Sequence, residues 1–558
     1  MARPLATEQT TRYREAQAIR NPRENDYRMA AAYCLPRHYN AWSLDGPANY
    51  GQSAVAATRR IAYDSTGVRA LPKYAAILER MATPHNMKWH GLTVGDRKLA
   101  QRPRVRLFFD ELRDELFRMR YEARSQFKQA MSEVNLSLGT YGTGPVYYGQ
   151  RGVSPLNRTP GFLYKACPLR DIFILVNDEG EVDTVFRRFW LNYRQFQQKF
   201  PNVKMPKTMA AKSANGVSPK ENDYVEFFHV VHTRTDYDPQ ALDSRRHPIV
   251  GSYVCVPDQE YVGEEEGFRS MPYLTPRTFT EAGDPYGFAP AMQALPALGT
   301  ASAMKKTAIK QGQKAVDPVI LAHDDGVLNG VVDLRPGHVN MGGVDKQGRK
   351  LIQTLESGNF NVSEKLLEQE REDINDSFFV TLFQILTETP EMTATEVMER
   401  VAERSSLLSP TMGRLQSELL GPGIMREIDM LDEMGRMPKI PPELIEAGAQ
   451  YDIVYTSPMA KGMYAEEVSG FMRAVEMAMN VAERTQDPSQ LDHFNFDVAI
   501  PEMSDYMAVP ARWMNEPKVK QAMRDGRAKA AQEAELMKNA APLAGAFKTA
   551  ASMQEGAQ

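Results

Sequence analysis

The chain has 558 residues, more than a single hydrophobic core accommodates, which predicts about three or four modules. Apolar residues make up 42% of it and charged residues 25%, a composition typical of a packed, soluble protein. A formal net charge of −4 excludes the basic excess on which tight nucleic-acid binding is built, and no apolar run could span a bilayer or form a signal peptide.

Three cysteines, Cys34, Cys167 and Cys255, lie far apart in the chain. Their odd number and wide spacing favour a reducing compartment and argue against both a disulfide framework and a zinc site. We therefore expect three buried thiols.

The N-terminal part of the chain is predicted to be helical. A charged, aromatic-rich segment over residues 1–45 precedes a second helix that begins at Ala54, and a break at residues 64–67 precedes an amphipathic helix over 68–81. Residues 104–138 are predicted to form one long helix.

A glycine-rich stretch, LGTYGTGP, ends that helix at residues 138–145. It could be a phosphate-binding loop, but Pro145 stands where a P-loop would open its helix with Lys and Ser or Thr. A turn into a strand is the better interpretation.

Residues 146–259 are predicted to be rich in strands. Residues 171–176 and 184–190 have the pattern of a hairpin, and 224–232 and 251–256 read as further strands. His229 and His232 would then lie on opposite faces of one strand, which argues against a shared metal ion. Residues 207–221 and 261–283 are expected to be loops.

The next stretch is predicted to be a helix over 296–315, a β-rich insert, and a second helix over 361–386. The second helix carries a predicted apolar stripe of Val362, Leu366, Ile374, Phe378, Leu382 and Ile385. A Pro-containing loop at 387–392 and a capping box of Thr393 and Glu396 follow. Two helices with a β insert at their end suggest a projecting stalk and a tip that bind other molecules.

The two helices differ in charge. The first has a net charge of +4 from Lys305, Lys306, Lys310 and Lys314, and the second has a net charge of −4. Such helices could pair within a chain or between copies, could simply be solvated, or could face a polyanion and a neighbour respectively. Glu388 and Glu391 make the following loop acidic, and acidic loops beside DNA repel phosphate.

The C-terminal part is predicted to contain a strand at 451–455 and helices at 465–484 and 510–537, with a frayed or disordered end. No HExxH, GxSxG, P-loop or CxxC motif is present, so no enzymatic activity is predicted. The sequence His323-Asp324-Asp325 could bind a metal, but the Gly326 that follows favours a hairpin turn.

Several short motifs, in this order, carry a family resemblance. They are Asp64-Ser65-Thr66-Gly67, Thr83-Pro84 with Trp89, Gly142-Thr143-Gly144, Tyr286-Gly287, Leu334-Arg335-Pro336-Gly337, and Met392-Thr393-Ala394-Thr395-Glu396-Val397 with Arg400. In these, the chain resembles the portal proteins, or head-to-tail connectors, of short-tailed, T7-like bacteriophages. Other virion assembly or tail adaptor proteins, and a nucleic-acid-processing enzyme, are the alternatives.

The resemblance implies an α+β subunit of a dodecameric ring at one capsid vertex, through which double-stranded DNA is packaged and ejected. It implies a wing at 1–283, stem helices at 284–315 and 361–386, a clip at 316–360 and a tunnel loop at 387–392. Residues 393–456 would return to the wing, 457–535 would form the crown, and 536–558 would be a flexible tail.

The resemblance also implies roles for residues and partners. The four stem lysines would line the DNA channel, and Asp324, Asp325, Arg335 and His338 would serve in clip docking. The tunnel loop would consist of Thr387, Glu388, Thr389, Pro390, Glu391 and Met392. Expected partners are the terminase large subunit, a tail adaptor, and the major capsid and scaffolding proteins, with internal core proteins as further candidates. No cofactor, metal or membrane is expected, and the protein would be made in the bacterial cytoplasm and reside in the virion.

Overall fold

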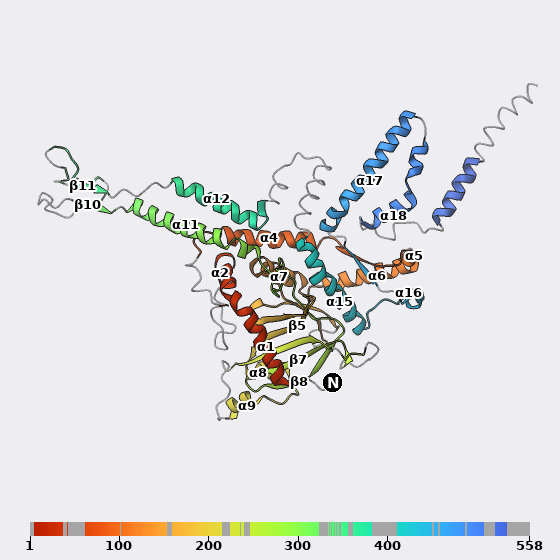
Figure 1. The fold of residues 1–558 in the computed structure, drawn as a ribbon, viewed down its shortest axis with the longest axis horizontal. Coiled ribbons are helices and arrows are strands. Elements are labelled where there is room, and N and C mark those ends of the chain that lie inside the picture. The colour runs from red at the N-terminus through yellow and green to blue at the C-terminus, as the bar shows by residue number, and fades with distance from the viewer. Residues whose placement is uncertain are drawn as a thin grey trace, which may run out of the picture. The chain divides into compact units, whose positions relative to one another are not determined.

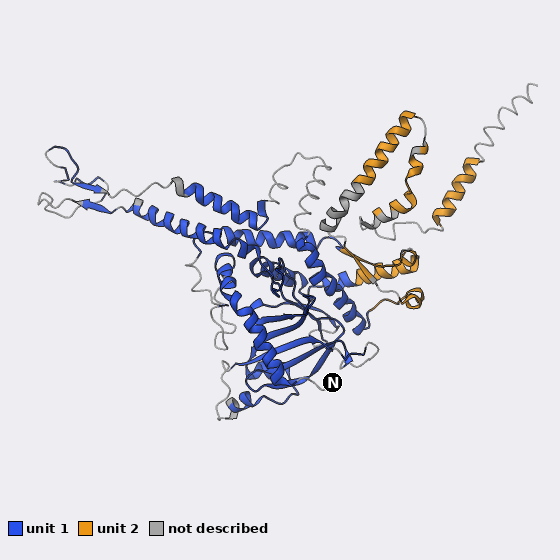
Figure 2. Cartoon of the chain, viewed as in Figure 1, with its two compact units in different colours: residues 1–89, 116–436, 457–466 blue, residues 90–115, 437–456, 467–558 orange. Residues whose placement is uncertain are grey.

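The fold is given by a computed structural model that divides into two compact units (Figure 2). The first unit comprises residues 1–89, 116–436 and 457–466, and the second comprises 90–115, 437–456 and 467–558. The structure describes residues 5–36, 42, 62–100, 102–152, 159–214, 224–234, 236–238, 246–317, 319–322, 333, 335, 337–339, 341, 343–344, 347–354, 361–381, 410–448, 451–455, 458–485, 488–506 and 519–532.

The first unit is built on an antiparallel sheet with strand order β4-β5-β6-β7-β8. A smaller sheet has the order β3-β2-β9. The strands are β2 (Val146–Arg151), β3 (Gly161–Ala166), β4 (Ile172–Val176), β5 (Val182–Leu191), β6 (Val225–Thr233), β7 (Ile249–Cys255), β8 (Glu260–Phe268) and β9 (Tyr273–Leu274).

Helices of the first unit surround these sheets (Figure 1). They are α1 (Ala6–Arg20), α2 (Glu24–Cys34), α4 (Thr66–Ala82), α7 (Phe127–Tyr141), α8 (Tyr193–Lys199), α9 (Lys207–Ala214), α10 (Pro290–Gln293) and α15 (Gly421–Glu433), with short 3₁₀ turns at Asn21–Arg23 and Leu169–Asp171. The α+β class predicted from the sequence is confirmed.

The core lies on both faces of the five-stranded sheet, because adjacent strand residues point to opposite sides. Phe228 stacks on Tyr13 of α1 with ring centroids 4.7 Å apart. Its neighbour Phe227 stacks on Phe196 of α8 at 5.8 Å. The hairpin predicted from residues 171–190 is formed by β4 and β5.

Two helices and the hairpin between them form what we call the arm (residues 295–377). It consists of α11 (Leu295–Val316), β10 (Ile320–Ala322), β11 (Ile352–Thr354) and α12 (Asn361–Ser377). The helices α11 and α12 pack against each other, and the antiparallel strands β10 and β11 lie at their far end (Figure 1). The predicted helix at 296–315 matches α11. The predicted helix at 361–386 matches α12 only as far as Ser377, because a turn with Phe379 at a φ of 55° follows, and residues 382–386 lie outside the described residues.

The second unit contains the strand pair β1 (His90–Val94) and β12 (Tyr451–Tyr455), which pair antiparallel. Its helices include α5 (Arg97–Ala100), α16 (Pro442–Ala447) and α18 (Phe496–Tyr506), with a 3₁₀ turn at Pro488–His493 and a helical segment at 519–532. Two further helices, α6 (Pro103–Arg120) and α17 (Pro458–Thr485), each have residues in both units. The strand predicted at 451–455 is confirmed, whereas its partner β1 was not predicted.

Three further predictions of local structure were wrong. The long helix at 104–138 is two helices, α6 and α7, separated by a turn in which Gln126 has a φ of 63°. The predicted loops at 207–221 and 261–283 contain α9 and the strands β8 and β9. In each case tertiary contacts outweigh a weak local pattern, as in the backbone hydrogen bond of 3.0 Å from Tyr164 of β3 to the Ser125 carbonyl.

Candidate functional site

A narrow apolar seam holds the two helices of the arm together. Leu298 and Ala301 of α11 are buried, as are Leu367 and Ile374 of α12. The prediction that Leu366 belongs to this seam was wrong, because its side chain is 50% exposed. Leu366 lies about 100° around the helix from Leu367, which repeats in phase with Ile374. Of the other predicted stripe residues, Phe378 is buried, while Leu382 and Ile385 lie outside the described residues.

A partly buried ion pair fastens the arm to the residues before α4. Arg371 of α12 donates from Nε and Nη2 to Asp64 Oδ2 at 3.1 and 2.7 Å. The backbone N–H of Thr66 donates to Asp64 Oδ1 at 2.8 Å. Burial by itself would raise the pKa of Asp64, but the hydrogen bonds from Thr66 and Arg371 outweigh burial and hold the pKa below its usual value. The predicted break at 64–67 is therefore the anchor of the arm.

Three of the four lysines of α11 are exposed to solvent. Lys306, Lys310 and Lys314 are exposed and Lys305 is half-buried. Between the described residues of α11 and α12, no ion pair joins a lysine to an acid, so of the predicted alternatives the pairing within one chain is not found. Lys306 Nζ instead lies 5.3 Å from the centroid of the Tyr63 ring. Among the described residues, the lysines of α11 are thus not neutralised by the acids of α12.

The tip of the arm exposes apolar side chains around the β10–β11 pair. In these strands Ile320 lies opposite Thr354 and Ala322 opposite Ile352. A three-residue strand pair buries too little to form a core of its own. The exposed apolar side chains near it are Val319, Leu321, Val339, Met341 and Val344.

Two of the predicted docking residues meet at the tip. The Nε of Arg335 donates to both carboxylate oxygens of Asp333 at 3.0 and 2.9 Å, and His338 Nδ1 lies 3.7 Å from the same carboxylate. The hydrogen bonds from Arg335 hold the pKa of Asp333 below its usual value. Asp324 and Asp325 lie outside the described residues. The structure therefore brings Arg335 and His338 together on a carboxylate that sequence reasoning missed.

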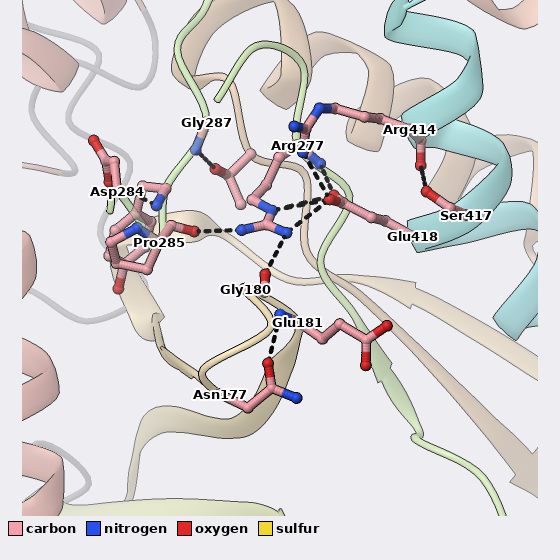
Figure 3. Close-up of polar contacts among 12 residues, drawn as sticks. Asn177, Gly180, Glu181, Arg277, Asp284, Pro285, Gly287, Arg414, Ser417 and Glu418 are labelled. Carbon is pink, nitrogen blue, oxygen red and sulfur yellow. Dashed lines mark hydrogen bonds and ion pairs between the residues drawn. The ribbon is translucent and has the colours of Figure 1, made fainter. Parts of the chain in front are cut away.

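A buried arginine of the first unit joins three chain segments (Figure 3). Arg277 Nη2 donates to Glu418 Oε1 at 2.7 Å and to the Gly180 carbonyl at 3.0 Å. Its Nη1 donates to the Pro285 carbonyl at 3.3 Å, and its backbone N–H donates to Glu418 Oε2 at 2.8 Å. We call this cluster the Arg277 junction. It links the β4–β5 turn, the segment before α10, and the helical segment 410–433.

The carboxylate of that junction lies in a π turn, Gln416–Leu420. The N–H of Gly421 bonds to the carbonyl five residues earlier, and Pro422 has no N–H to give to the Glu418 carbonyl. In a regular helix, Glu418 and Glu427 would be nine residues and about 180° apart. The extra residue of a π turn reduces this to about 80°, so one helix can present both carboxylates to the same body.

The second of these carboxylates forms a fully buried ion pair. Arg120 Nε donates to Glu427 Oε1 at 3.0 Å, and Tyr164 Oη donates to the same oxygen at 2.7 Å. The Arg120 guanidinium also lies 4.6 Å from the centroid of the Trp89 ring. Burial by itself would lower the pKa of Arg120, but Glu427 outweighs burial and raises it. Burial and Glu427 both raise the pKa of Tyr164.

A close backbone contact accompanies the Arg277 junction. Gly142 has a φ of 74° and ends α7, as the predicted turn into a strand requires. A Cβ on Gly142 would overlap the carbonyl of Gly287, and a Cβ on Gly287 would overlap that of Gly142. The N–H of Gly287 donates to Thr143 Oγ1 at 3.0 Å (Figure 3). These glycines of the sequence motifs let two segments touch.

The predicted tunnel loop cannot be placed, because Thr387, Glu388, Thr389, Pro390, Glu391 and Met392 lie outside the described residues. The same holds for the capping box of Thr393 and Glu396 and for the predicted turn at His323. On the C-terminal side of that loop the described residues resume at residue 410, in the helical segment whose Glu418 binds Arg277.

Comparison with known protein families gives a match over residues 6–514 to the bacteriophage head to tail connecting proteins. The chain belongs to this family. Membership identifies a phage portal protein that connects head and tail, a structural component of the virion portal vertex and not an enzyme. It implies an oligomeric ring with DNA passage.

Two relatives of this portal protein are similar over most of their length. The portal protein of Salmonella phage epsilon15 is 26% identical over 437 residues, 77% of this chain and 76% of the relative. A protein of Bordetella phage BPP-1, described as a probable portal protein, is 26% identical over 503 residues, 86% of this chain and 85% of the relative. A chain from the virion of a native gene transfer agent particle covers 74% of this chain and 86% of its own length, at 13% identity and a TM-score of 0.30.

Two features of the described residues of this portal protein concern membranes and metal ions. None of its described helices has the length and apolar character needed to cross a membrane. Within the same residues, no group of three or more His, Cys, Asp or Glu side chains is arranged to hold a metal ion.

Proposed function

We propose that twelve copies of this chain form the ring at one capsid vertex of a short-tailed, T7-like phage, and that double-stranded DNA is packaged and ejected through it. The observation that carries this proposal is the arm. It projects charged and apolar surfaces that have no counterpart within the described part of the chain, as a subunit of a closed ring requires.

In this proposal the arm is the stem and clip of the subunit. Residues 284–315 and 361–386 form the stem, 316–360 the clip, and 1–283 the wing. Residues 387–392 form the tunnel loop, 393–456 return to the wing, 457–535 form the crown, and 536–558 are a flexible tail. The order of α11, β10, β11 and α12 supports this assignment.

The lysines of α11 would face the DNA and the acids of α12 a neighbouring copy. Support comes from the exposure of Lys306, Lys310 and Lys314 and from the lack of ion pairs between the four lysines, the half-buried Lys305 included, and the described residues of α12. Four lysines per subunit can attract phosphate without reading bases, which allows DNA to slide. The acidic side chains Glu388 and Glu391 would repel phosphate in the loop that follows.

The tip of the arm would dock the terminase large subunit during packaging and a tail adaptor afterwards. The exposed apolar side chains around β10 and β11 support this role, because isolated apolar surface of this kind is characteristic of interaction sites. Arg335, His338, Asp324 and Asp325 would give the contact its polar rim. The major capsid and scaffolding proteins, and internal core proteins, would contact other parts of the ring.

Negative-stain electron microscopy and mass photometry of the purified protein test the ring directly. We expect particles with a central hole and a mass near twelve subunits. A monodisperse monomer or dimer, unchanged across salt and protein concentration, would contradict the proposal.

A packaging assay tests the channel. Replacing Lys306 and Lys310 with Glu should leave rings intact and reduce the DNA packaged, whereas Gln311 and Gln313 replaced with Glu add the same number of acids on other positions of α11. Equal packaging by both variants would remove the lysines from the channel. In the same assay, Glu388→Lys with Glu391→Lys should impair packaging, and normal packaging would remove the loop from the proposal.

A further inference from the structure

The helix α17 has apolar side chains that the described part of the chain leaves exposed. Phe471, Val475, Ala478 and Ala482 are half-buried on one side of the helix. The Phe471 ring contacts those of Phe494 and Phe496, with centroids 5.7 and 6.4 Å away. Because Phe496 begins α18, we call this side of α17 the inner face of the α17–α18 hairpin, whose two helices are seen in Figure 1.

Two further apolar groups flank that inner face. Residues in an α-helix advance by about 100°, which places Met472 and Met479 roughly 20° apart on one side of the inner face. Met477 and Val481 lie together on the other side, about 140–200° away from the first pair. All four side chains are between 43% and 69% exposed. We call these pairs flank A (Met472 and Met479) and flank B (Met477 and Val481).

Charges of opposite sign border the two flanks. Glu476 and Glu483 follow flank A toward the polar side of the helix, whereas Arg473 and Arg484 follow flank B. All four charged residues are exposed. The acidic border spans residues 476–483 and the basic border spans 473–484, so the two stand at the same height along the helix.

We propose that flank A of one copy packs against flank B of the next copy, so that α17 hairpins stand side by side around the ring. A heterologous interface joins two different patches of one chain, and equivalent residues of neighbouring copies in a closed ring lie at the same height. The two flanks are different apolar patches with borders of opposite charge, as a heterologous interface requires. They also lie at the same height along α17, as a closed ring requires. If flank A packed against flank A of the next copy, or flank B against flank B, borders of like charge would meet instead. The inference rests on the proposed ring.

Cysteine cross-linking in the full-length protein tests this packing. With Met477→Cys and Met479→Cys in one chain, a short bismaleimide should link successive copies and give a ladder of bands on a denaturing gel. Either cysteine alone should give almost no cross-linked product, because like flanks do not meet. The native thiols of Cys34, Cys167 and Cys255 are at most 4% exposed and serve as a constant background.

Microscopy of the same samples separates the two levels of failure. Intact rings with no ladder from the double variant would overturn the flank packing and leave the ring standing. Dimers formed by either single variant as efficiently as by the double variant would also overturn it. Absence of rings from the wild-type protein would overturn the ring, and the packing with it.

Charge exchange in the same cysteine variant provides a second test, which addresses the charged borders of the two flanks. In the double-cysteine background, Glu483→Arg should lower the ladder yield severalfold, because each interface then has like charges. Adding Arg484→Glu should restore most of the yield, whereas Asn480→Lys in the middle of the polar side should leave it unchanged. Failure of Arg484→Glu to restore a yield lost with Glu483→Arg would overturn the pairing of these borders.

Discussion

Two arginines in the body of the first unit are buried in ion pairs, whereas lysines on the outer surfaces of the arm are exposed. In the body, Arg120 and Arg277 are almost completely buried, and each is held by a carboxylate of the helical segment 410–433. On the arm, Lys310 and Lys314 are exposed and make no ion pair with the described acids of α12. A buried charge without a counter-charge loses its hydration and strongly destabilises the fold. An exposed charge keeps its hydration, so that it needs no ion-pair partner within the subunit. Buried pairs therefore define the subunit, and exposed charges mark where it meets other molecules.

Breaking the pair between Arg120 and Glu427 should have the largest effect on the subunit. Arg120→Leu leaves the Glu427 carboxylate buried without its counter-charge and should lower the free energy of unfolding by about 3–5 kcal/mol. Denaturant unfolding of the full-length protein measures this change. The double variant with Glu427→Leu should recover much of the loss, and a double variant as unstable as Arg120→Leu would contradict the role of the ion pair.

The backbone contact of Gly287 should be the next most sensitive position. Gly287→Ala places a Cβ against the Gly142 carbonyl and should lower the free energy of unfolding by about 1–3 kcal/mol. The matched control is Gly312→Ala in α11, where a Cβ would meet nothing within 4 Å. This control should be neutral or stabilising by up to about 1 kcal/mol. Equal effects of the two variants would show that the close approach does not matter.

The buried His229 extends the comparison of buried and exposed groups to the pH dependence of stability. Burial, with smaller contributions from Lys199 and Arg187, holds the pKa of His229 well below its usual value of 6.5. The unfolded chain therefore takes up a proton before the folded chain does, and stability present above about pH 6.5 is lost as pH falls toward the folded-state pKa. The loss should approach about 1.4 kcal/mol per pH unit for this group.

Unfolding measured at several pH values between 7 and 5 checks this expectation. His229→Phe keeps a ring to stack on Tyr253, whose centroid lies 4.2 Å from that of His229. The variant should lose less stability than the wild type over that range. Equal slopes for the two proteins would show that His229 does not titrate between the folded and unfolded states as proposed.

The smallest effect on the subunit is expected on the arm. Lys310→Glu should change the free energy of unfolding by no more than about 0.5 kcal/mol, because the side chain is exposed. Gln313→Glu is the matched control on the same helix. A loss for Lys310→Glu as large as that of Gly287→Ala would mean that the lysine belongs to the fold of the subunit.

Much of the local structure could be predicted from the sequence, because it depends on neighbours in the chain. The spacing of apolar residues predicted α11, and two strand-like runs joined by a turn sequence at residues 177–180 predicted the β4–β5 hairpin. The break at Gln126 could not be predicted, since no glycine or proline marks it and it depends on a bond to β3. Leu366 and Leu367 are chemically identical, and only the packing of α12 decides which one is buried.

The candidate site divides in the same way. The sequence by itself determined the charges of the arm helices, the glycines of the motifs and the family, because these are properties of residue type and order. Only the tertiary structure decided that Arg277 meets Glu418 from 141 positions away and that a π turn sets the phase of that carboxylate. Contacts at such separation depend on the path of the whole chain, and no local pattern of residues encodes that path.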